Sequence, residues 1–180
     1  ELMGWKAGLS LGTFDCLGKG ALPVAVAALL GQSVAVQAGV GLATIVGHNW
    51  SPFIRFTGGR GVATAIGVYV ASLMLYELLA QAVLFGLVGR LLLRDSGLWT
   101  LVSMLAIPPM AFVLGRDREL VIMSGAIAVV LIAKRLTANW AMPQGDYRLS
   151  RLLAYRLLWD RDVPRKQQWI AGDRRADGGG

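Results

Sequence analysis

Charged side chains are scarce in this 180-residue sequence, and they are unevenly spread. Asp, Glu, Lys and Arg make up 16% of the residues, against roughly 25% in an average soluble domain, while hydrophobic residues make up 55%. The segments 20–54, 96–115 and 120–133 contain no charged residue. Such runs exclude an ordinary soluble domain and indicate segments that are long enough to cross a bilayer.

Cysteine and histidine are nearly absent, since the sequence contains only Cys16 and His48. A single cysteine excludes a disulfide within the chain, and Cys16 has no partners at metal-ligand spacing. The 11 acidic residues do not cluster near the glycine-rich segment 47–64. We therefore predict no metal site and no bound cofactor.

The uncharged runs predict the fold class. A bilayer core of ~30 Å takes about 20 residues of helix, and backbone groups in lipid must be satisfied by a helix or a closed barrel. Because the runs do not alternate polar and apolar residues, helices are the better interpretation. We predict an all-α, polytopic membrane bundle with about six transmembrane helices, near 5–31, 33–50, 61–76, 78–94, 97–115 and 119–135.

Two charged residues interrupt the first predicted span. Asp15 and Lys19 stand four positions apart, on one face of a helix. They can neutralise each other as a packed pair. Alternatively they belong to a functional site, because ionisable groups inside a membrane are costly and are usually functional.

The linkers between the predicted spans predict an orientation. Basic linkers alternate with neutral or acidic ones, and by the positive-inside rule the basic set faces the cytoplasm. The basic residues are Arg55, Arg60, Arg90, Arg94, Lys134 and Arg135. We therefore expect a multi-pass protein of the cell inner membrane, with the glycine-rich loop and the C-terminus in the cytoplasm.

The C-terminal part differs in composition from the predicted transmembrane domain, residues 1–143. Segment 144–171 is basic, and the apolar spacing within 149–159 predicts an amphipathic helix that lies on an anionic leaflet or is simply solvated. The end, 172–180, has the composition of a disordered segment. We predict contact with membrane lipids and no nucleic-acid partner, because the rest of the chain lies in lipid.

The loop between the second and third predicted spans carries the clearest chemistry. Gly58, Gly59 and Gly61 flank Arg60 directly before a helix. Glycines let backbone N–H groups turn toward an anion, and the following helix presents its positive end to the same place. An arginine adds a planar cation that suits phosphate. The loop predicts a phosphate site, although a flexible connector with an orienting arginine is also consistent with it.

Other polar residues near this loop are candidates for the same site. His48 can act as a general base or hydrogen-bond donor, or it is only a polar group at a helix end. Asn49 can donate to phosphate or cap a helix. Thr64 lies in the first turn of the following helix and is the better placed of the two for a ligand.

The segment 47–64 closely resembles a hallmark segment of the acyl-phosphate-dependent glycerol-3-phosphate acyltransferases (the PlsY family). The residues that match are Gly47, His48, Pro52, Phe53, Phe56, Gly58, Gly59, Gly61, Val62, Ala63 and Thr64. Upstream, Asp15 to Pro23 is similar to the family's Asp-x-x-Lys-Gly segment with one extra residue, and it includes Lys19. The span that begins near Ser96 is similar to the family's serine-containing span. The resemblance covers most of residues 4–140.

The resemblance implies a seven-helix membrane enzyme with its active face toward the cytoplasm. Such an enzyme transfers an acyl group from acyl phosphate to glycerol 3-phosphate, which yields lysophosphatidic acid for phospholipid synthesis and releases phosphate. It needs little beyond positioning and charge stabilisation, because acyl phosphate is already activated. Arg60 and His48 are then the expected catalytic residues. The expected substrate-binding residues are Gly58, Gly59, Gly61, Thr64, Asn49, Lys19, Ser96, Lys134, Arg135 and Asn139.

Three departures from the family pattern support an alternative. The family's first motif would just precede Glu1, so we expect the sequence to be a fragment. The family's loop lysine is Arg60 here, and the late His-x-x-Asn segment is represented only by Lys134 to Asn139, without the histidine. The alternative is a catalytically divergent or inactive membrane paralogue that binds a phosphorylated lipid or metabolite. An unrelated transporter would require the loop match to be a coincidence.

Overall fold

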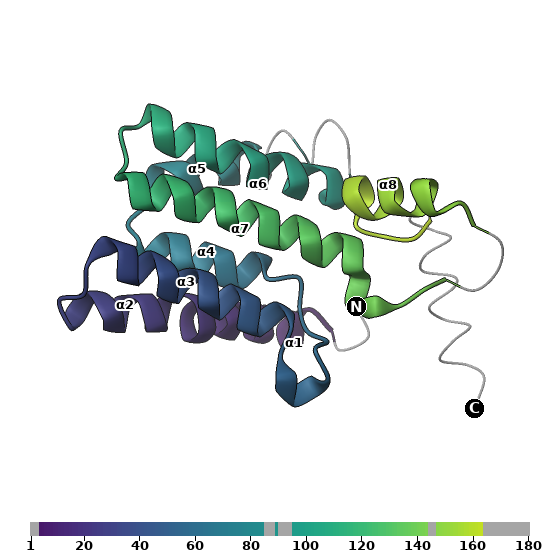
Figure 1. Ribbon diagram of the computed structural model, residues 1–180, viewed down its shortest axis with the longest axis horizontal. Coiled ribbons are helices and arrows are strands. Elements are labelled where there is room, and N and C mark those ends of the chain that lie inside the picture. Colours follow the sequence, from purple (N-terminus) through teal and green to yellow (C-terminus); the bar gives the residue numbers. More distant parts are fainter. Residues whose placement is uncertain (1–3, 85–88, 90–94, 144–146, 164–180) are drawn as a thin grey trace.

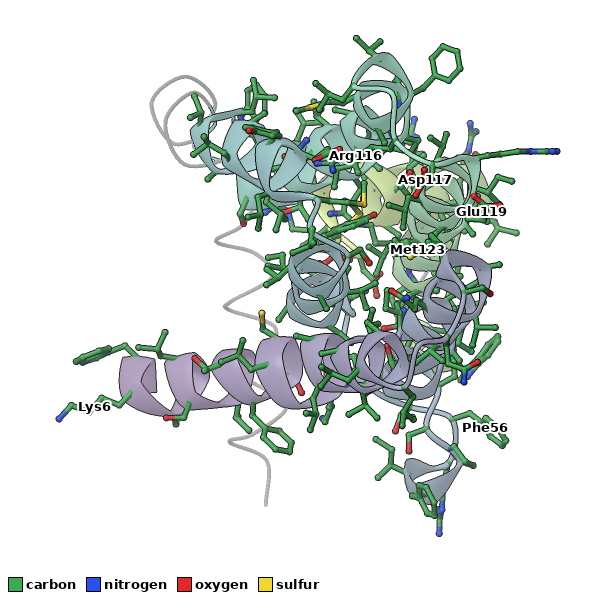
Figure 2. The ribbon with its side chains drawn as sticks, turned by 90° about the vertical axis from the view of Figure 1, so that its left-hand side faces the viewer. Lys6, Phe56, Arg116, Asp117, Glu119 and Met123 are labelled. Atoms are coloured by element: carbon green, nitrogen blue, oxygen red, sulfur yellow. The ribbon has the colours of Figure 1, made fainter. Side chains whose placement is uncertain are left out.

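The structure, a computed structural model, describes residues 4–84, 89, 95–143 and 147–163. In these residues almost all regular structure is helical, and strand-like pairing is limited to one isolated bridge between Ser51 and Thr57. The predicted all-α class is confirmed. Most of the helices run along the length of the molecule (Figure 1), while the purple N-terminal helix lies at an angle across them (Figure 2).

The first helical segment is continuous from residue 4 to residue 29, close to the predicted span 5–31. It consists of α1 (Gly4–Thr13), a π-helical stretch η1 (Phe14–Ala21) and α2 (Leu22–Leu29). Asp15 and Lys19 both lie in η1 and form an ion pair of 2.7 Å, as the pairing interpretation predicts.

Helix α4 (Val62–Ala71) packs directly against the backbone of η1. A side chain at Gly20 would collide with the Thr64 carbonyl, and one at Gly67 would collide with the Cys16 carbonyl. Small residues are used at helix contacts in membranes because they allow this close approach. These two glycines are thus explained by packing.

Helix α3 (Val34–Asn49) matches the predicted span 33–50. The Ser33 side chain caps its first turn by accepting from the Val36 N–H at 3.4 Å. The preceding turn contains Gly31 at φ +68°, a left-handed conformation that glycine adopts at little cost.

The third predicted span, 61–76, is wrong at its C-terminal end. Helix α4 stops at Ala71, and α5 (Leu75–Ala82) begins after a turn in which Leu73 has φ 56°. This turn contains no glycine, proline or charge, so composition did not reveal it. Most of the remainder of the fourth predicted span, 78–94, lies outside the described residues.

The last two predicted spans correspond to α6 (Ser96–Val113) and α7 (Arg118–Thr137). Asp95 caps α6 by accepting from the Gly97 N–H at 3.0 Å. A short turn η4 (Ala138–Trp140) follows α7. Helix α6 and the combined segment 118–140 are the two helices in the described residues that are long and apolar enough to cross a membrane.

Apolar side chains occur on both the inside and the outside of the bundle. Ile45, Val68, Ile127 and Leu131 are almost fully buried between α3, α4 and α7. Many large apolar side chains are exposed as well, including Leu29, Phe112 and Val113. This much exposed apolar surface is unusual for a protein in water and suits an exterior that faces lipid.

Helix α8 (Leu149–Trp159) has the bounds predicted for the amphipathic tail helix. It packs against α6 and α7 and buries Leu152 and Arg156. The Arg156 guanidinium donates to the Leu136 carbonyl at 3.1 Å and pairs with Asp162 at 2.6 Å. The tail helix therefore belongs to the bundle, while its contact with a leaflet stays a prediction. The segment 172–180 lies outside the described residues.

The linkers predicted to face away from the cytoplasm lie at the same end of the bundle. Glu77, whose side chain is fully buried, accepts from the Nε and Nη2 atoms of Arg116 at 2.7 and 2.8 Å. Figure 2 views the bundle from this end, with Arg116 near the turn between α6 and α7. The loop with Phe56 lies well away from this turn. The basic linker with Arg90 and Arg94 lies outside the described residues, so the predicted orientation stays a prediction.

We expect the Glu77→Gln substitution to destabilise the fold by about 3 kcal/mol, because it leaves a guanidinium without its buried partner. The measurement is thermal or denaturant unfolding of the purified protein in detergent. Glu119→Gln is the control, since Glu119 is exposed on the neighbouring turn. Equal stability of the two variants would contradict this role for the pair.

Candidate active site

The glycine-rich loop projects from one end of the bundle between α3 and α4 (Figures 1 and 2). It contains a short turn η2 (Pro52–Ile54), after which Arg55 and Phe56 adopt left-handed backbone conformations at φ 55° and 59°. Phe53 at its tip is 94% exposed. The return segment, residues 58–61, comes back against the end of α3.

The three glycines of this segment are required by contacts within the protein. A side chain at Gly58 would collide with the carbonyls of His48 and Asn49, and one at Gly59 would collide with the His48 ring. Gly61 has φ +77° and lies against the Asn49 side chain. The sequence pattern alone suggested an anion site and did not reveal that the glycines fit the end of α3.

The end of α7 holds the returning loop in place. Lys134 is fully buried, and its ammonium group donates to the Asn49 carbonyl and, at 2.5 Å, to Asn139 Oδ1. Asn139 in turn accepts from the Gly58 N–H and donates to the Gly58 carbonyl, both at 3.2 Å. These two predicted substrate residues therefore fix the shape of the loop.

Arg60 lines a cavity of about 350 Å³, here called the cation cavity, between the starts of α4 and α6 and the ends of α7 and α8. Arg135 lines the same cavity, and its Nη1 donates to the carbonyls of Gly97 and Leu157, each at 3.0 Å. The cavity's polar lining includes Arg60, Ser96, Thr100, Arg135, Asp160 and Arg161. Three residues predicted from the sequence are thus brought together.

Two acidic residues that the sequence analysis did not select accompany these arginines. Asp160 Oδ1 lies 2.9 Å from Arg60 Nη1, and Asp95 Oδ2 lies 2.6 Å from Arg161 Nη2. Burial raises the pKa of the Asp160 carboxyl above its ordinary value, and the nearby guanidiniums of Arg60 and Arg135 oppose that shift. The tail composition gave no signal for the Asp160 contact, because Asp160 is one of several alternating charges there.

A second polar cavity, here called the histidine cavity, has a volume of about 500 Å³ and lies on the other side of the glycine segment. Lys19, His48, Gly58 and Gly59 line it. Asp15 pairs with Lys19, and its Oδ1 lies 3.7 Å from His48 Nδ1. The charged pair in η1 therefore lies beside the loop, so its packing and functional interpretations are compatible.

An apolar cavity of about 380 Å³ lies between α4, α5, α6 and α7. Three residues, Val62, Thr100 and Met104, line both this cavity and the cation cavity, so the two adjoin. Gln81 and Ser103 also line the apolar cavity, and their buried polar atoms have no hydrogen-bond partner. The charged cation cavity and the apolar cavity are therefore neighbours that share part of their lining.

Thr64 and Asn49 are both fully buried and line none of these three cavities. The Thr64 hydroxyl and the Asn49 amide group have no hydrogen-bond partner. The Thr64 carbonyl lies at the packed contact between α4 and η1, and the Asn49 side chain lies against Gly61. Their predicted contact with substrate stays a prediction.

The comparison with known proteins supplies the family. A family model described as glycerol-3-phosphate acyltransferase matches residues 1–141. The chain belongs to this family. The resemblance identified from residues 47–64 is thereby confirmed.

Two named relatives show how much of the family's length is present. A glycerol-3-phosphate acyltransferase of Trichlorobacter lovleyi is 41% identical over 132 residues, which are 73% of this chain and 66% of that protein. Glycerol-3-phosphate acyltransferase 4 of Dehalococcoides mccartyi is 33% identical over 175 residues, which are 93% of this chain and 73% of that protein. The chain thus spans just under two thirds of the first relative and somewhat more of the second.

Solved structures show a shared fold. The crystal structure of PlsY (YgiH), an integral membrane glycerol 3-phosphate acyltransferase, in its glycerol 3-phosphate form matches with a TM-score of 0.66 at 24% identity. The match covers 94% of this chain and 76% of that one, and the lysophosphatidic acid form matches equally well. The predicted helical membrane bundle is confirmed, while the number of spans stays a prediction.

We expect Gly61→Ala to destabilise this acyltransferase-family fold by about 2 kcal/mol, because alanine is strained at positive φ and its methyl group would meet the Asn49 side chain. The measurement is the unfolding temperature in detergent. Gly39→Ala in α3 is the control, because a methyl group there meets nothing within 4 Å. Similar unfolding temperatures for both variants would show that the glycine segment is not tightly packed.

Proposed function

We propose that this protein transfers an acyl group from acyl phosphate to glycerol 3-phosphate and so forms lysophosphatidic acid. One observation carries the proposal: the cation cavity and the apolar cavity share Val62, Thr100 and Met104. A ligand with an anionic head and a long hydrocarbon tail suits such a pair of cavities. Acyl phosphate has this form, and so does the product.

In this proposal the cation cavity binds the phosphate group of the donor. Guanidinium groups such as those of Arg60 and Arg135 make paired hydrogen bonds to phosphate oxygens. The acceptor hydroxyl attacks the acyl carbon, an ester bond forms, and the bond between the acyl carbon and the phosphate oxygen breaks. The positive charges then stabilise the phosphate that leaves, which is the main help an activated anhydride needs.

We further propose that glycerol 3-phosphate binds in the histidine cavity. This cavity is polar, and Lys19 supplies a cation for the acceptor's phosphate. His48 lies on the same side and is suited to accept the hydroxyl proton. Gly58 and Gly59 line this cavity while the adjacent Arg60 lines the other. In this proposal the loop keeps the two phosphate groups apart, while the acceptor hydroxyl and the acyl carbon meet beside it.

The proposed reaction suits a membrane face. A hydrocarbon chain reaches the apolar cavity most easily from lipid, while glycerol 3-phosphate is soluble in water. We therefore propose that the protein is a multi-pass protein of the inner membrane, with the glycine loop and α8 on the cytoplasmic side. The positive charge at this end of the bundle supports that orientation.

A specific observation favours the alternative of a binding protein without activity. The Arg60 guanidinium is already paired with Asp160, and the late segment that begins at Lys134 has no histidine. A protein with this arrangement would still bind a phosphorylated lipid. An acyltransferase would release inorganic phosphate from acyl phosphate, whereas a binding protein would not.

Arg60→Ala tests the proposed reaction. We expect acyl phosphate turnover that depends on glycerol 3-phosphate to fall at least about 100-fold, because a charge-stabilising donor is lost. The measurement is release of inorganic phosphate by the full-length protein in detergent or lipid. Arg55→Ala is the matched control, because Arg55 lies on the same loop and lines neither polar cavity.

Two outcomes would contradict the proposed function. Absence of acceptor-dependent phosphate release by folded, full-length protein would favour the binding protein. An equal loss of activity in the Arg55 and Arg60 variants would show that Arg60 has no particular role.

Ser103→Leu tests the proposed place of the acyl chain. A leucine at this position fills part of the apolar cavity, so we expect the ratio of kcat/KM for palmitoyl phosphate to that for decanoyl phosphate to fall about tenfold. Ser103→Ala is the control, because it removes the hydroxyl group without filling the cavity. An unchanged ratio in the leucine variant would place the chain elsewhere.

A further inference from the structure

The cation cavity contains a carboxylate that comes from a distant part of the chain. Asp160 Oδ1 lies 2.9 Å from Arg60 Nη1, although the two residues are far apart in the sequence. Both residues line the cavity together with Arg135. An anionic group therefore already stands among the arginines that we assign to the donor's phosphate.

The position of this carboxylate is fixed by the end of α8. Asp160 is the C-terminal cap of that helix, with φ 56°, and its N–H donates to the Arg156 carbonyl at 3.1 Å. Residues before and after Asp160 are also held by ion pairs: Arg156 pairs with Asp162, and Arg161 pairs with Asp95. These bonds hold the turn against the bundle, so Asp160 is part of a built contact and not a loose tail group.

Close backbone packing on α6 supports the same conclusion. A side chain at Gly97 would collide with the backbone of Trp159, directly before Asp160. Arg135 connects the two helices of this contact, because its Nη1 donates to the Gly97 carbonyl on α6 and to the Leu157 carbonyl on α8. The carboxylate thus reaches the cavity because α8 and the start of α6 are in direct contact.

A carboxylate and a phosphate group compete for the same guanidinium. Both accept charge-assisted hydrogen bonds from arginine, and phosphate has more oxygens and close to two negative charges near neutral pH. Two such anions close together on one arginine would repel each other. The repulsion between the two anions therefore favours phosphate binding at Arg60 when Asp160 has moved away.

We propose that Asp160 is a positioning residue for Arg60, and that it occupies the place of phosphate in the cation cavity until a phosphorylated ligand displaces it. The inference rests on the proposed function, in which this cavity binds the donor's phosphate. Asp160 then sets how much phosphorylated ligand is needed to fill the cavity. It lowers the affinity for the donor and, equally, for inorganic phosphate, which is the product that would otherwise remain bound.

Asp160→Asn tests this role in the full-length protein, because asparagine keeps the size and tolerates the left-handed backbone but removes the charge. We expect KM for acyl phosphate and the inhibition constant for inorganic phosphate both to fall about tenfold, since the ion pair between Asp160 and Arg60 no longer has to be broken. We expect kcat to change by less than KM does. Asp160→Gly, which also suits a positive φ, should shift both constants in the same direction.

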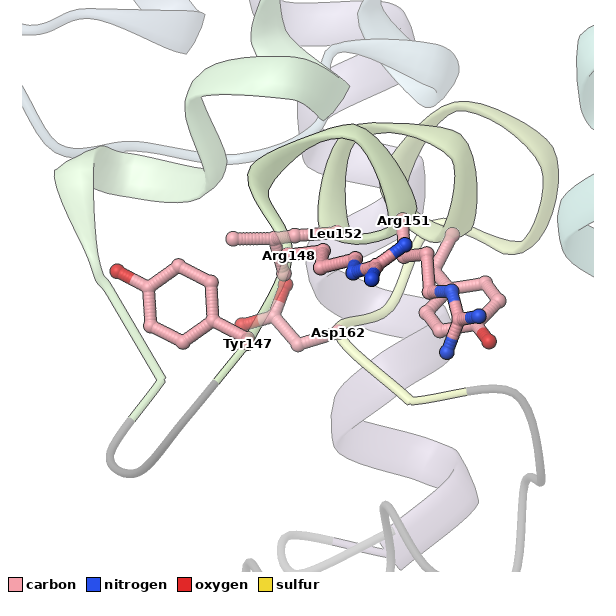
Figure 3. A pocket seen from close by; sticks show the side chains of 6 residues that line it. Tyr147, Arg148, Arg151, Leu152 and Asp162 are labelled. Carbon is pink, nitrogen blue, oxygen red and sulfur yellow. The ribbon is translucent and has the colours of Figure 1, made fainter.

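Asp162→Asn is the matched control. Asp162 lies two residues further along and pairs with Arg156, and it lines a different cavity with Tyr147, Arg148 and Arg151 (Figure 3). Loss of the Asp162 charge should weaken the attachment of α8, while the Asp160 charge beside Arg60 remains. Unchanged or raised constants in the Asp160 variants would overturn the proposal. In Asp162→Asn we expect at most a smaller decrease, because looser attachment of α8 draws Asp160 away from Arg60 only part of the time.

A second measurement separates this inference from the proposed reaction. Inorganic phosphate should raise the unfolding temperature, and the phosphate concentration that gives half of this effect should fall about tenfold in Asp160→Asn. If no variant turns over acyl phosphate but this concentration falls, the proposed reaction fails and the role of Asp160 stands. If the unmodified protein is active and this concentration does not fall, the role of Asp160 fails and the reaction stands.

Discussion

A buried ammonium group at the end of α7 connects three parts of the chain. Lys134 donates to the Asn49 carbonyl at the end of α3 and to Asn139, and Asn139 bonds both backbone groups of Gly58. A buried charge is costly unless it is hydrogen-bonded, so the conformation of the loop and the burial of Lys134 depend on each other. Because the loop is fixed to the end of α7, Arg60 and Arg135 can line one cavity.

The cavities next to this contact separate two kinds of chemistry. Charged groups gather at the end of the bundle, and the space between α4, α5, α6 and α7 is mainly apolar. The walls that both cavities share, including Val62 and Thr100, are where a polar head would give way to a hydrocarbon chain. In the proposed reaction, a lipid precursor would then need no deep channel through water. The proposed orientation would give the bilayer and the aqueous phase access to the apolar and the charged side of the same small region.

The sequence was most informative where composition and local pattern determine structure. The uncharged runs predicted α3, α6 and α7 closely, and the pattern at 149–159 predicted α8. The turn at Leu73 was missed because its apolar residues differ little from the helices on either side.

Long-range contacts within the site could not be predicted in the same way. The loop was recognised from its glycines and Arg60, but their fit against His48 depends on how α3 ends. Asp160 was missed because pairing between positions so far apart leaves no local signal.

The contact between α8 and the start of α6, at Gly97, also has consequences for the order in which the site is assembled. During synthesis the glycine loop emerges about 100 residues before Asp160, and domains acquire their contacts as the chain emerges. We therefore expect Arg60 to lack its Asp160 partner until α8 has emerged, so that the last described helix completes the cation cavity.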